Sequence, residues 1–212
     1  MSTNNLRKIS IAAGVAGVIA QTANTSQAQG VDELIAGIKS DSAEKRTQAW
    51  QSAGQVGAPA VKALAKVMTD DNLEVARAVK RALWQIVRYT ARPGANREKR
   101  AVEAELIELL GDEQPVAVKR EELWMLSEIG SRRSIDSIAG LIKNEDLCED
   151  ARMALERIPN RRAVAALKTA FAEAPEDFKP NLAQSLRKRG EEVTDYPCQK
   201  LVPTKKTDVK PL

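Results

Sequence analysis

The side chains in this sequence that could do acid, base or metal chemistry are few. Among 212 residues there is no histidine, and the cysteines are Cys148 and Cys198. Without imidazole there is no Ser-His-Asp or Cys-His nucleophile and no His-ligated zinc or iron, and two thiolates are too few for a four-cysteine cluster. The adjacent glutamates Glu121–Glu122 and Glu191–Glu192 would point to different faces of a helix. We therefore predict no catalytic residues, no metal site and no cofactor.

The N-terminal segment has the pattern of a secretory signal peptide. Arg7 and Lys8 precede an apolar run at 9–20, and small residues stand at Ser26 and Ala28. This order predicts cleavage after Ala28, with residues 1–28 removed and no membrane span left in the mature chain. We therefore expect an exported protein, periplasmic or secreted.

The charge balance of the chain argues against a protein that binds its partner through a strong net positive charge. The whole chain carries 33 basic and 29 acidic residues, a net charge of +4, and loss of residues 1–28 leaves 31 basic against 29 acidic groups. A field this weak does not by itself indicate nucleic acid or an anionic membrane. In an oxidising compartment, Cys148 and Cys198 are one possible disulfide, with two unpaired thiols as the alternative.

Apolar residues between 31 and 190 recur with helical spacing in five copies. The second helix of each copy has slots at relative positions 0, +4, +7, +8 and +11, which share one face. Examples are Val75, Val79, Ala82, Leu83 and Ile86 in the second copy and Leu147, Ala151, Ala154, Leu155 and Ile158 in the fourth. The first helices show a matching stripe, as in Val102, Leu106 and Leu110. The pattern predicts an all-α fold, an α-solenoid of about five antiparallel helix pairs over residues 29–190.

This repeat resembles the short HEAT repeats of about thirty residues that also occur in phycobilisome-lyase-like proteins. The best matches are REELWMLSEIG at 120–130 and VARAVKRALWQI at 75–86. The resemblance implies a HEAT-like superhelix but specifies no function, because the matching residues are those that pack.

Three residues depart from the repeat pattern. Lys45 and Arg189 occupy core slots of the first and last copies, which suits capping repeats whose outer face meets water. Glu122 occupies a slot in the third copy, and a buried carboxylate needs a partner. We expect Arg152, Lys119 or Lys80 to pair with Glu122 in a structural role.

The second helices, which usually line the concave side of HEAT-like solenoids, also carry a row of arginine and tryptophan. We call these residues the Arg/Trp ridge and expect them to bind a partner, because both side chains contribute strongly at protein interfaces. They are Arg77, Arg81, Trp84, Arg88, Arg120 and Trp124. The alternative is that the tryptophans fill gaps between copies while the arginines pair with local acids such as Glu74 and Glu121. Trp50, beside a core slot, is assigned to packing.

Two further segments lie outside the repeat pattern. The second and third copies are 43 residues apart rather than about 30, and the extra segment at 89–99 contains Pro93-Gly94 and several basic residues. It is either a projecting loop that contacts a partner or a solvated loop without a role. Residues 191–212 have no helical period and are expected to form an extended, partly mobile tail.

The sequence therefore favours an exported, non-catalytic scaffold that binds a protein or peptide partner through its concave helices. Two alternatives remain: a nucleic-acid-binding HEAT-like protein, which export and the weak net charge disfavour, and a lyase or enzyme accessory of the phycobilisome-lyase type. The pattern does not fix the oligomeric state.

Overall fold

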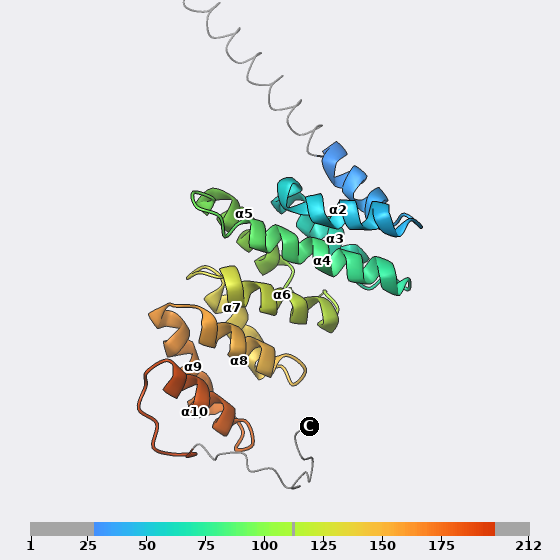
Figure 1. The fold of residues 1–212 in the computed structure, drawn as a ribbon. Helices are drawn as coiled ribbons and strands as arrows, with labels where there is room; N and C mark the ends of the chain where they lie inside the picture. The colour runs from blue at the N-terminus through green and yellow to red at the C-terminus, as the bar shows by residue number, and fades with distance from the viewer. Residues whose placement is uncertain (1–27, 112, 198–212) are drawn as a thin grey trace, which may run out of the picture.

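The computed structural model describes residues 28–111 and 113–197, and this part of the chain is all-helical, without a strand. The helices form an α-solenoid of antiparallel pairs, as the sequence predicts (Figure 1). The second helices of the pairs are α2 (Ala43–Val56), α4 (Leu73–Tyr89), α6 (Val116–Ile129), α8 (Cys148–Arg157) and α10 (Lys179–Lys188). The first helices are residues 28–38, α3 (Val61–Val67) after η1 (Ala58–Ala60), α5 (Asn96–Glu108), α7 (Ile135–Gly140) with η2 (Leu141–Lys143), and α9 (Arg161–Glu173).

Short polar side chains start several of these helices. The Ser42 hydroxyl accepts from the amide of Lys45, and the Asn72 side chain accepts from the amide of Glu74. Asn160 caps α9 in the same way. Such caps satisfy helix-start amides that have no partner within the helix. Glycine ends α2, because Gly57 adopts a φ of 71° that other residues rarely adopt.

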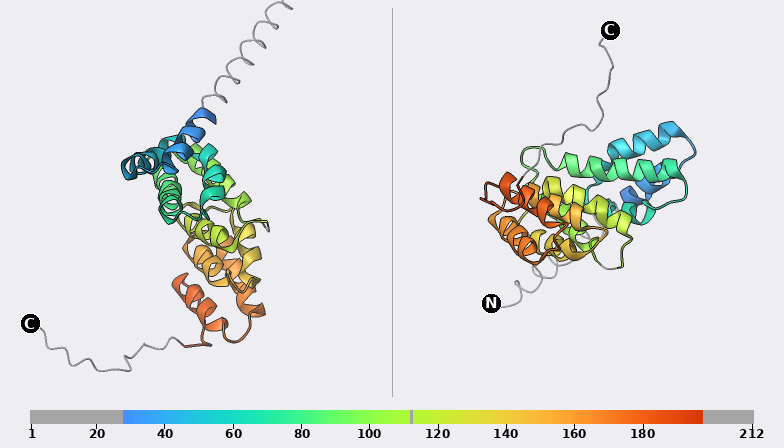
Figure 2. Two further views of the ribbon diagram at one scale, coloured as in Figure 1. Left: turned by 90° about the vertical axis from the view of Figure 1, so that its right-hand side faces the viewer. Right: turned by 90° about the horizontal axis from the view of Figure 1, so that it is seen from below.

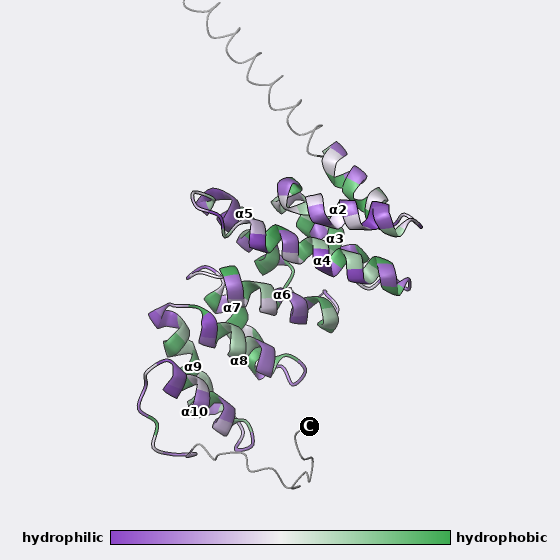
Figure 3. Ribbon diagram, in the orientation of Figure 1, coloured by the Kyte–Doolittle hydropathy of each residue, from purple (hydrophilic) through white to green (hydrophobic). Residues whose placement is uncertain are grey.

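The core lies between the two layers of helices and runs through all the pairs. In the second, third and fourth pairs every predicted second-helix slot is buried, and Leu106, Leu123 and Ile138 are among the residues with no exposed surface. The pairs follow one another along the molecule in Figure 2. Figure 3 shows hydrophilic residues on the visible side of every labelled helix. Each pair therefore completes its burial against its neighbours. In this part of the chain no helix is both long and apolar enough to cross a membrane.

The end pairs are completed by polar contacts. Lys45 is exposed, as expected of a first capping copy. Arg189 differs from the expectation, because its guanidinium is half-buried and donates to the carbonyl oxygens of Glu156 (2.9 Å), Leu155 (3.3 Å) and Ile158. A cation at the carbonyls of the last turn stabilises the end of α8.

The extra length between the second and third pairs is a short connection between two helices that extend into it. The sequence predicts a loop at 89–99, and residues 90–95 form one, but α4 extends to Tyr89 and α5 begins at Asn96, so the loop is shorter at both ends than predicted. The connection is also tied down locally. Arg92 stacks 3.9 Å from the centre of the Tyr89 ring, donates to the Tyr89 carbonyl and pairs with Glu98.

The start of the C-terminal tail folds back onto the last pair. Arg187 donates to the carbonyls of Val193 (3.2 Å), Asp195 (2.8 Å) and Tyr196, and the Tyr196 hydroxyl donates to Glu176. Residues 191–197 contain no helix, as the sequence predicts, and these contacts place them against the last pair. Cys198 and the proposed signal peptide up to residue 27 lie outside the described residues. The Cys148–Cys198 disulfide consequently stays a prediction.

Glu122 contradicts the expected structural ion pair. Its side chain is fully buried in α6, and neither carboxylate oxygen has a hydrogen-bond partner. Arg152 pairs instead with Glu149 and Glu156, and Lys80 pairs with Glu121. Burial, reinforced by the nearby charge of Glu121, raises the pKa of Glu122 from 4.5 to about 8. The core is thus built to hold this residue as a neutral acid.

The buried Glu122 predicts a pH-dependent stability. In the unfolded chain its carboxyl ionises near its ordinary pKa, whereas the folded state holds the proton until about pH 8. The contribution of Glu122 to the free energy of unfolding should therefore be highest below pH 5 and fall by about 1.4 kcal/mol per pH unit between pH 5 and 8, and comparison with variants at this position isolates it from the other carboxyl groups. Glu122→Met should remove this slope and stabilise the protein by about 2–4 kcal/mol at pH 8. Urea unfolding at each pH measures both effects.

Glu122→Gln is the matched control for shape. It removes the ionisable group but buries an amide, so it should lose the slope and gain less stability than the methionine variant. Identical pH profiles for all three proteins would contradict the burial of an unpaired carboxyl.

Candidate protein-binding face

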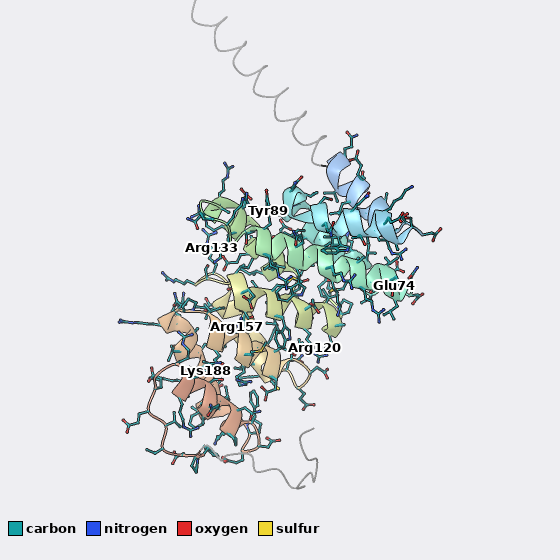
Figure 4. All side chains as sticks on the ribbon, viewed as in Figure 1. Glu74, Tyr89, Arg120, Arg133, Arg157 and Lys188 are labelled. Carbon is teal, nitrogen blue, oxygen red and sulfur yellow. The ribbon has the colours of Figure 1, made fainter. Side chains whose placement is uncertain are left out.

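The side chains that project outward from α2, α4, α6, α8 and α10 form one surface, which we call the second-helix face. It carries the whole Arg/Trp ridge, with Arg77, Arg81, Trp84 and Arg88 on α4 and Arg120 and Trp124 on α6. These helices pack side by side. At one point α2 and α4 come so close that a Cβ on Gly54 would lie 2.8 Å from the Cβ of Tyr89. In Figure 4, Glu74 and Arg120 lie towards one side of the molecule, and Arg157 and Arg133, the latter from the turn before α7, lie towards the other.

Both ridge tryptophans donate to an acid on the next second helix. The Trp84 indole nitrogen lies 2.7 Å from Oε1 of Glu121 in α6, whose other oxygen lies 3.1 Å from Lys80. The Trp124 indole nitrogen lies 2.9 Å from Oδ1 of Asp150 in α8. These bonds cross the boundary between pairs, so they fix the spacing of α4, α6 and α8.

Two ridge arginines are also engaged within the molecule. Arg120 Nε lies 2.9 Å from Oδ2 of Asp150, and the same guanidinium donates to the carbonyl of Asp146 at 2.7 Å. Arg77 pairs with Glu74 one turn away at 2.7 Å. Because the first of these pairs is partly buried and bridges two helices, it contributes more than the exposed Arg77 pair.

The same kind of contact continues between α8 and α10. Ser185 donates to Glu156, Lys188 pairs with the other Glu156 oxygen at 2.6 Å, and Arg152 bonds to both Glu156 and Ser185. Burial raises the pKa of Glu156, but the hydrogen bonds from Lys188 and Ser185 outweigh it, and the pKa lies below its ordinary value. At this end of the face, the charged side chains of the network bond to one another, so few of their donors and acceptors remain available to a partner.

Arg81 and Arg88 differ from the other ridge arginines. The Arg81 guanidinium lies 5.8 Å from the centre of the Trp50 ring, and that of Arg88 lies 5.5 Å from the centre of the Trp84 ring. Both arginines are exposed. Among the described residues, no acidic group lies within ion-pair distance of either. Their planar donors are therefore held in place by an aromatic ring and remain available for a carboxylate.

A shallow hollow adjoins Arg88 where α4 and α6 end. Its volume is about 300 Å³, and it is lined by Trp84, Val87, Arg88, Ala91, Glu128 and Ile129. We call it the Trp84 groove. Its apolar wall and the neighbouring guanidinium suit an apolar side chain beside a carboxylate.

The structure thus divides the predicted ridge in two. Trp84, Arg120 and Trp124 bridge pairs and Arg77 pairs with Glu74, as the alternative of internal packing expects, although Glu121 engages Trp84 and Lys80 rather than an arginine. Arg81 and Arg88 keep free donors, and Trp124 remains 40% exposed. The sequence reasoning missed Asp150 and the stacking of Arg81 on Trp50. The repeat register places α6 beside α8, and it could have predicted the contact between Trp124 and Asp150.

The connections between successive pairs form a basic edge, which we call the inter-pair edge. Arg97 and Arg100 lie at the start of α5, Arg132 and Arg133 before α7, and Arg161 at the start of α9. All five are exposed, and no acid of the described residues pairs with them. A cation at a helix start is electrostatically unfavourable, so these arginines do not stabilise the helices that they begin.

Comparison with known proteins adds little to this description. No protein-family model matches the chain, and no curated protein matches it significantly. Among solved structures, it is similar to two engineered proteins determined by the Northeast Structural Genomics Consortium, each 18% identical. The alignments cover 74% of this chain and 80% and 78% of the engineered chains, with TM-scores of 0.40 and 0.37.

The shared use of Asp150 predicts that its removal loosens the boundary between the third and fourth pairs. Asp150→Ala should lower the free energy of unfolding by about 1–2 kcal/mol, because it leaves both the Trp124 indole and the Arg120 guanidinium without their carboxylate acceptor. Glu74→Ala is the matched control: it also removes an acid from the first turn of a second helix, but one that pairs only with exposed Arg77. It should cost about 0.5 kcal/mol or less. Urea unfolding followed by tryptophan fluorescence compares them, and equal losses would contradict the bridging role of Asp150.

Proposed function

We propose that this protein is a non-catalytic HEAT-like scaffold that binds a protein or peptide partner through the second-helix face. The contact is centred on Arg81, Arg88 and the Trp84 groove, with the exposed part of Trp124 beside them. The partner offers carboxylates to the two guanidinium groups and an apolar side chain to the groove. We further propose that residues 1–28 direct its export, and that the partner is met outside the cytoplasm.

The observation that carries this proposal is the pair of arginines stacked on tryptophan without an acidic partner. Elsewhere on the second-helix face the arginines are paired within the molecule, as Arg77, Arg120 and Arg152 are. Stacking limits the movement of a guanidinium while leaving its in-plane donors open. Two such groups on one rigid helix lose little conformational entropy on binding, which favours affinity.

The residue types of the whole chain support a binding role rather than catalysis. It has no histidine, and among the described residues the one carboxyl whose pKa is strongly raised, that of Glu122, is fully buried in the core. Glu121, Asp150 and Glu156 of the second-helix face are engaged in bonds between helices. What the face presents is shape, guanidinium groups and indole surface, which are the features of a protein interface.

A second candidate function is nucleic-acid binding by the inter-pair edge. Five exposed arginines without acidic partners favour it, since guanidinium groups bind phosphate as well as carboxylate. The near balance of 31 basic and 29 acidic groups after the proposed cleavage argues against it, because long-range attraction to a polyanion would be weak.

Paired substitutions separate the two candidates. Arg81→Gln with Arg88→Gln should weaken binding to a partner captured from the native cell envelope by about tenfold or more, without changing helicity. The matched control, Arg97→Gln with Arg100→Gln, removes the same charge from the inter-pair edge and should leave that affinity unchanged. Binding is measured by calorimetry with the purified partner.

The opposite pattern would support the second candidate. Loss of binding only in the Arg97 and Arg100 variant, together with an affinity for duplex DNA that falls steeply with rising salt, would point to nucleic acid. Equal partner affinity for the wild type and the Arg81 and Arg88 variant would remove the proposed face.

A further inference from the structure

A hollow lies at the end of the solenoid and is lined by none of the residues of the Arg/Trp ridge. It has a volume of about 740 Å³ and lies between the turn that joins η2 to α8 and the turn that joins α9 to α10. Its floor is apolar, with Ile142, Ala170, Ala174 and Phe178, and Cys148 also lines it. We call it the end hollow.

The rim of the end hollow is acidic. Glu173 pairs with Lys143 at 2.8 Å and so joins the two turns. Glu145 and Asp177, which also line the hollow, are exposed, and no basic group of the described residues pairs with them. An apolar floor with uncompensated carboxylates at its edge fits a segment that carries apolar and basic residues together.

The described part of the chain ends beside this hollow. The Tyr196 hydroxyl donates to Glu176, which lies between the hollow-lining residues Pro175 and Asp177, and its ring packs edge-on against Phe171 of α9 at 5.8 Å. Arg187 holds the backbone of the same segment through three carbonyls. These contacts lead the chain across the last pair towards the α9–α10 turn, where the described residues stop at Pro197 (Figure 1).

The residues that follow have the composition that the hollow requires. The segment 198–212 reads CQKLVPTKKTDVKPL, with Leu201 and Val202 flanked by basic residues. Leu201 is four residues beyond Pro197, so it can reach about 14 Å from that point. The segment contains four lysines and one acidic residue. Its positive charge complements the acidic rim of the hollow.

We propose that residues 198–212 of the same chain occupy the end hollow, with Leu201 and Val202 against its apolar floor and the neighbouring lysines near Glu145 and Asp177. Among the described residues no helix follows α10, and in this proposal the tail covers the surface that a following pair would bury. This proposal is independent of the second-helix face, which lies on other residues.

The Cys148 thiol provides a direct probe of occupancy. Cys198→Ser leaves Cys148 as the single cysteine, and its labelling by an aromatic disulfide reports access to the hollow. In that background, Leu201→Asp with Val202→Asp should increase the labelling rate about tenfold, because it opens a docked segment. Thr204→Asp with Thr207→Asp adds the same charge but keeps both apolar residues, and it should change the rate less than twofold.

Three further measurements complete the test. Labelling in urea should be equal for all variants, and circular dichroism should show equal helicity, so that a faster rate reports the hollow rather than unfolding. A synthetic peptide of residues 198–212 with serine at 198 should slow the labelling of the Leu201 and Val202 variant. Equal native rates in all full-length variants would overturn the proposal, as would protection that disappears on dilution, which would assign the hollow to a second copy of the chain.

Discussion

The constraint on which the structure depends is that no helix pair buries its own apolar surface completely. Each pair is covered by its neighbours, so the core is a continuous strip rather than a single centre. In the middle pairs this works through closely packed aliphatic residues such as Leu123 and Ile138, which have no exposed surface. At the C-terminal end of the described helices, polar groups complete the packing: Arg189 donates to carbonyls at the end of α8, and the Tyr196 hydroxyl donates to Glu176 between α9 and α10.

The boundaries between pairs are also where the acids of the second-helix face act. Glu121 and Asp150 each accept an indole proton from the preceding pair and also engage a cation. This arrangement gives the second helices a fixed register, and it leaves the arginines that stack on indole rings without a carboxylate. The same side-chain types therefore serve two roles, and position relative to the next helix decides between them.

Glu122 is the clearest local conflict in the molecule. A consistent sequence places an apolar residue in that slot, as the second and fourth pairs do with Val79 and Ala151. Here the carboxyl is buried without a partner. Burial disfavours its charged form, so its pKa is raised and the protonated form is preferred. The neighbouring apolar slots, Val118, Met125, Leu126 and Ile129, are all buried and keep the helix in place despite this cost.

The sequence by itself determined the helices, their pairing and their core slots, because helical periodicity records which residues must leave water. It also excluded histidine-dependent nucleophiles and histidine-ligated metal sites, since the chain contains no histidine. It did not determine which ridge residues are free: Arg81 and Arg120 have similar sequence surroundings, but only the packing of α6 against α8 brings Asp150 to Arg120. Nor did it show that Glu122 lacks a partner or that residues 191–197 fold back. Those outcomes depend on distances between residues that are not neighbours along the chain, such as Arg120 and Asp150, and only the tertiary structure sets such distances.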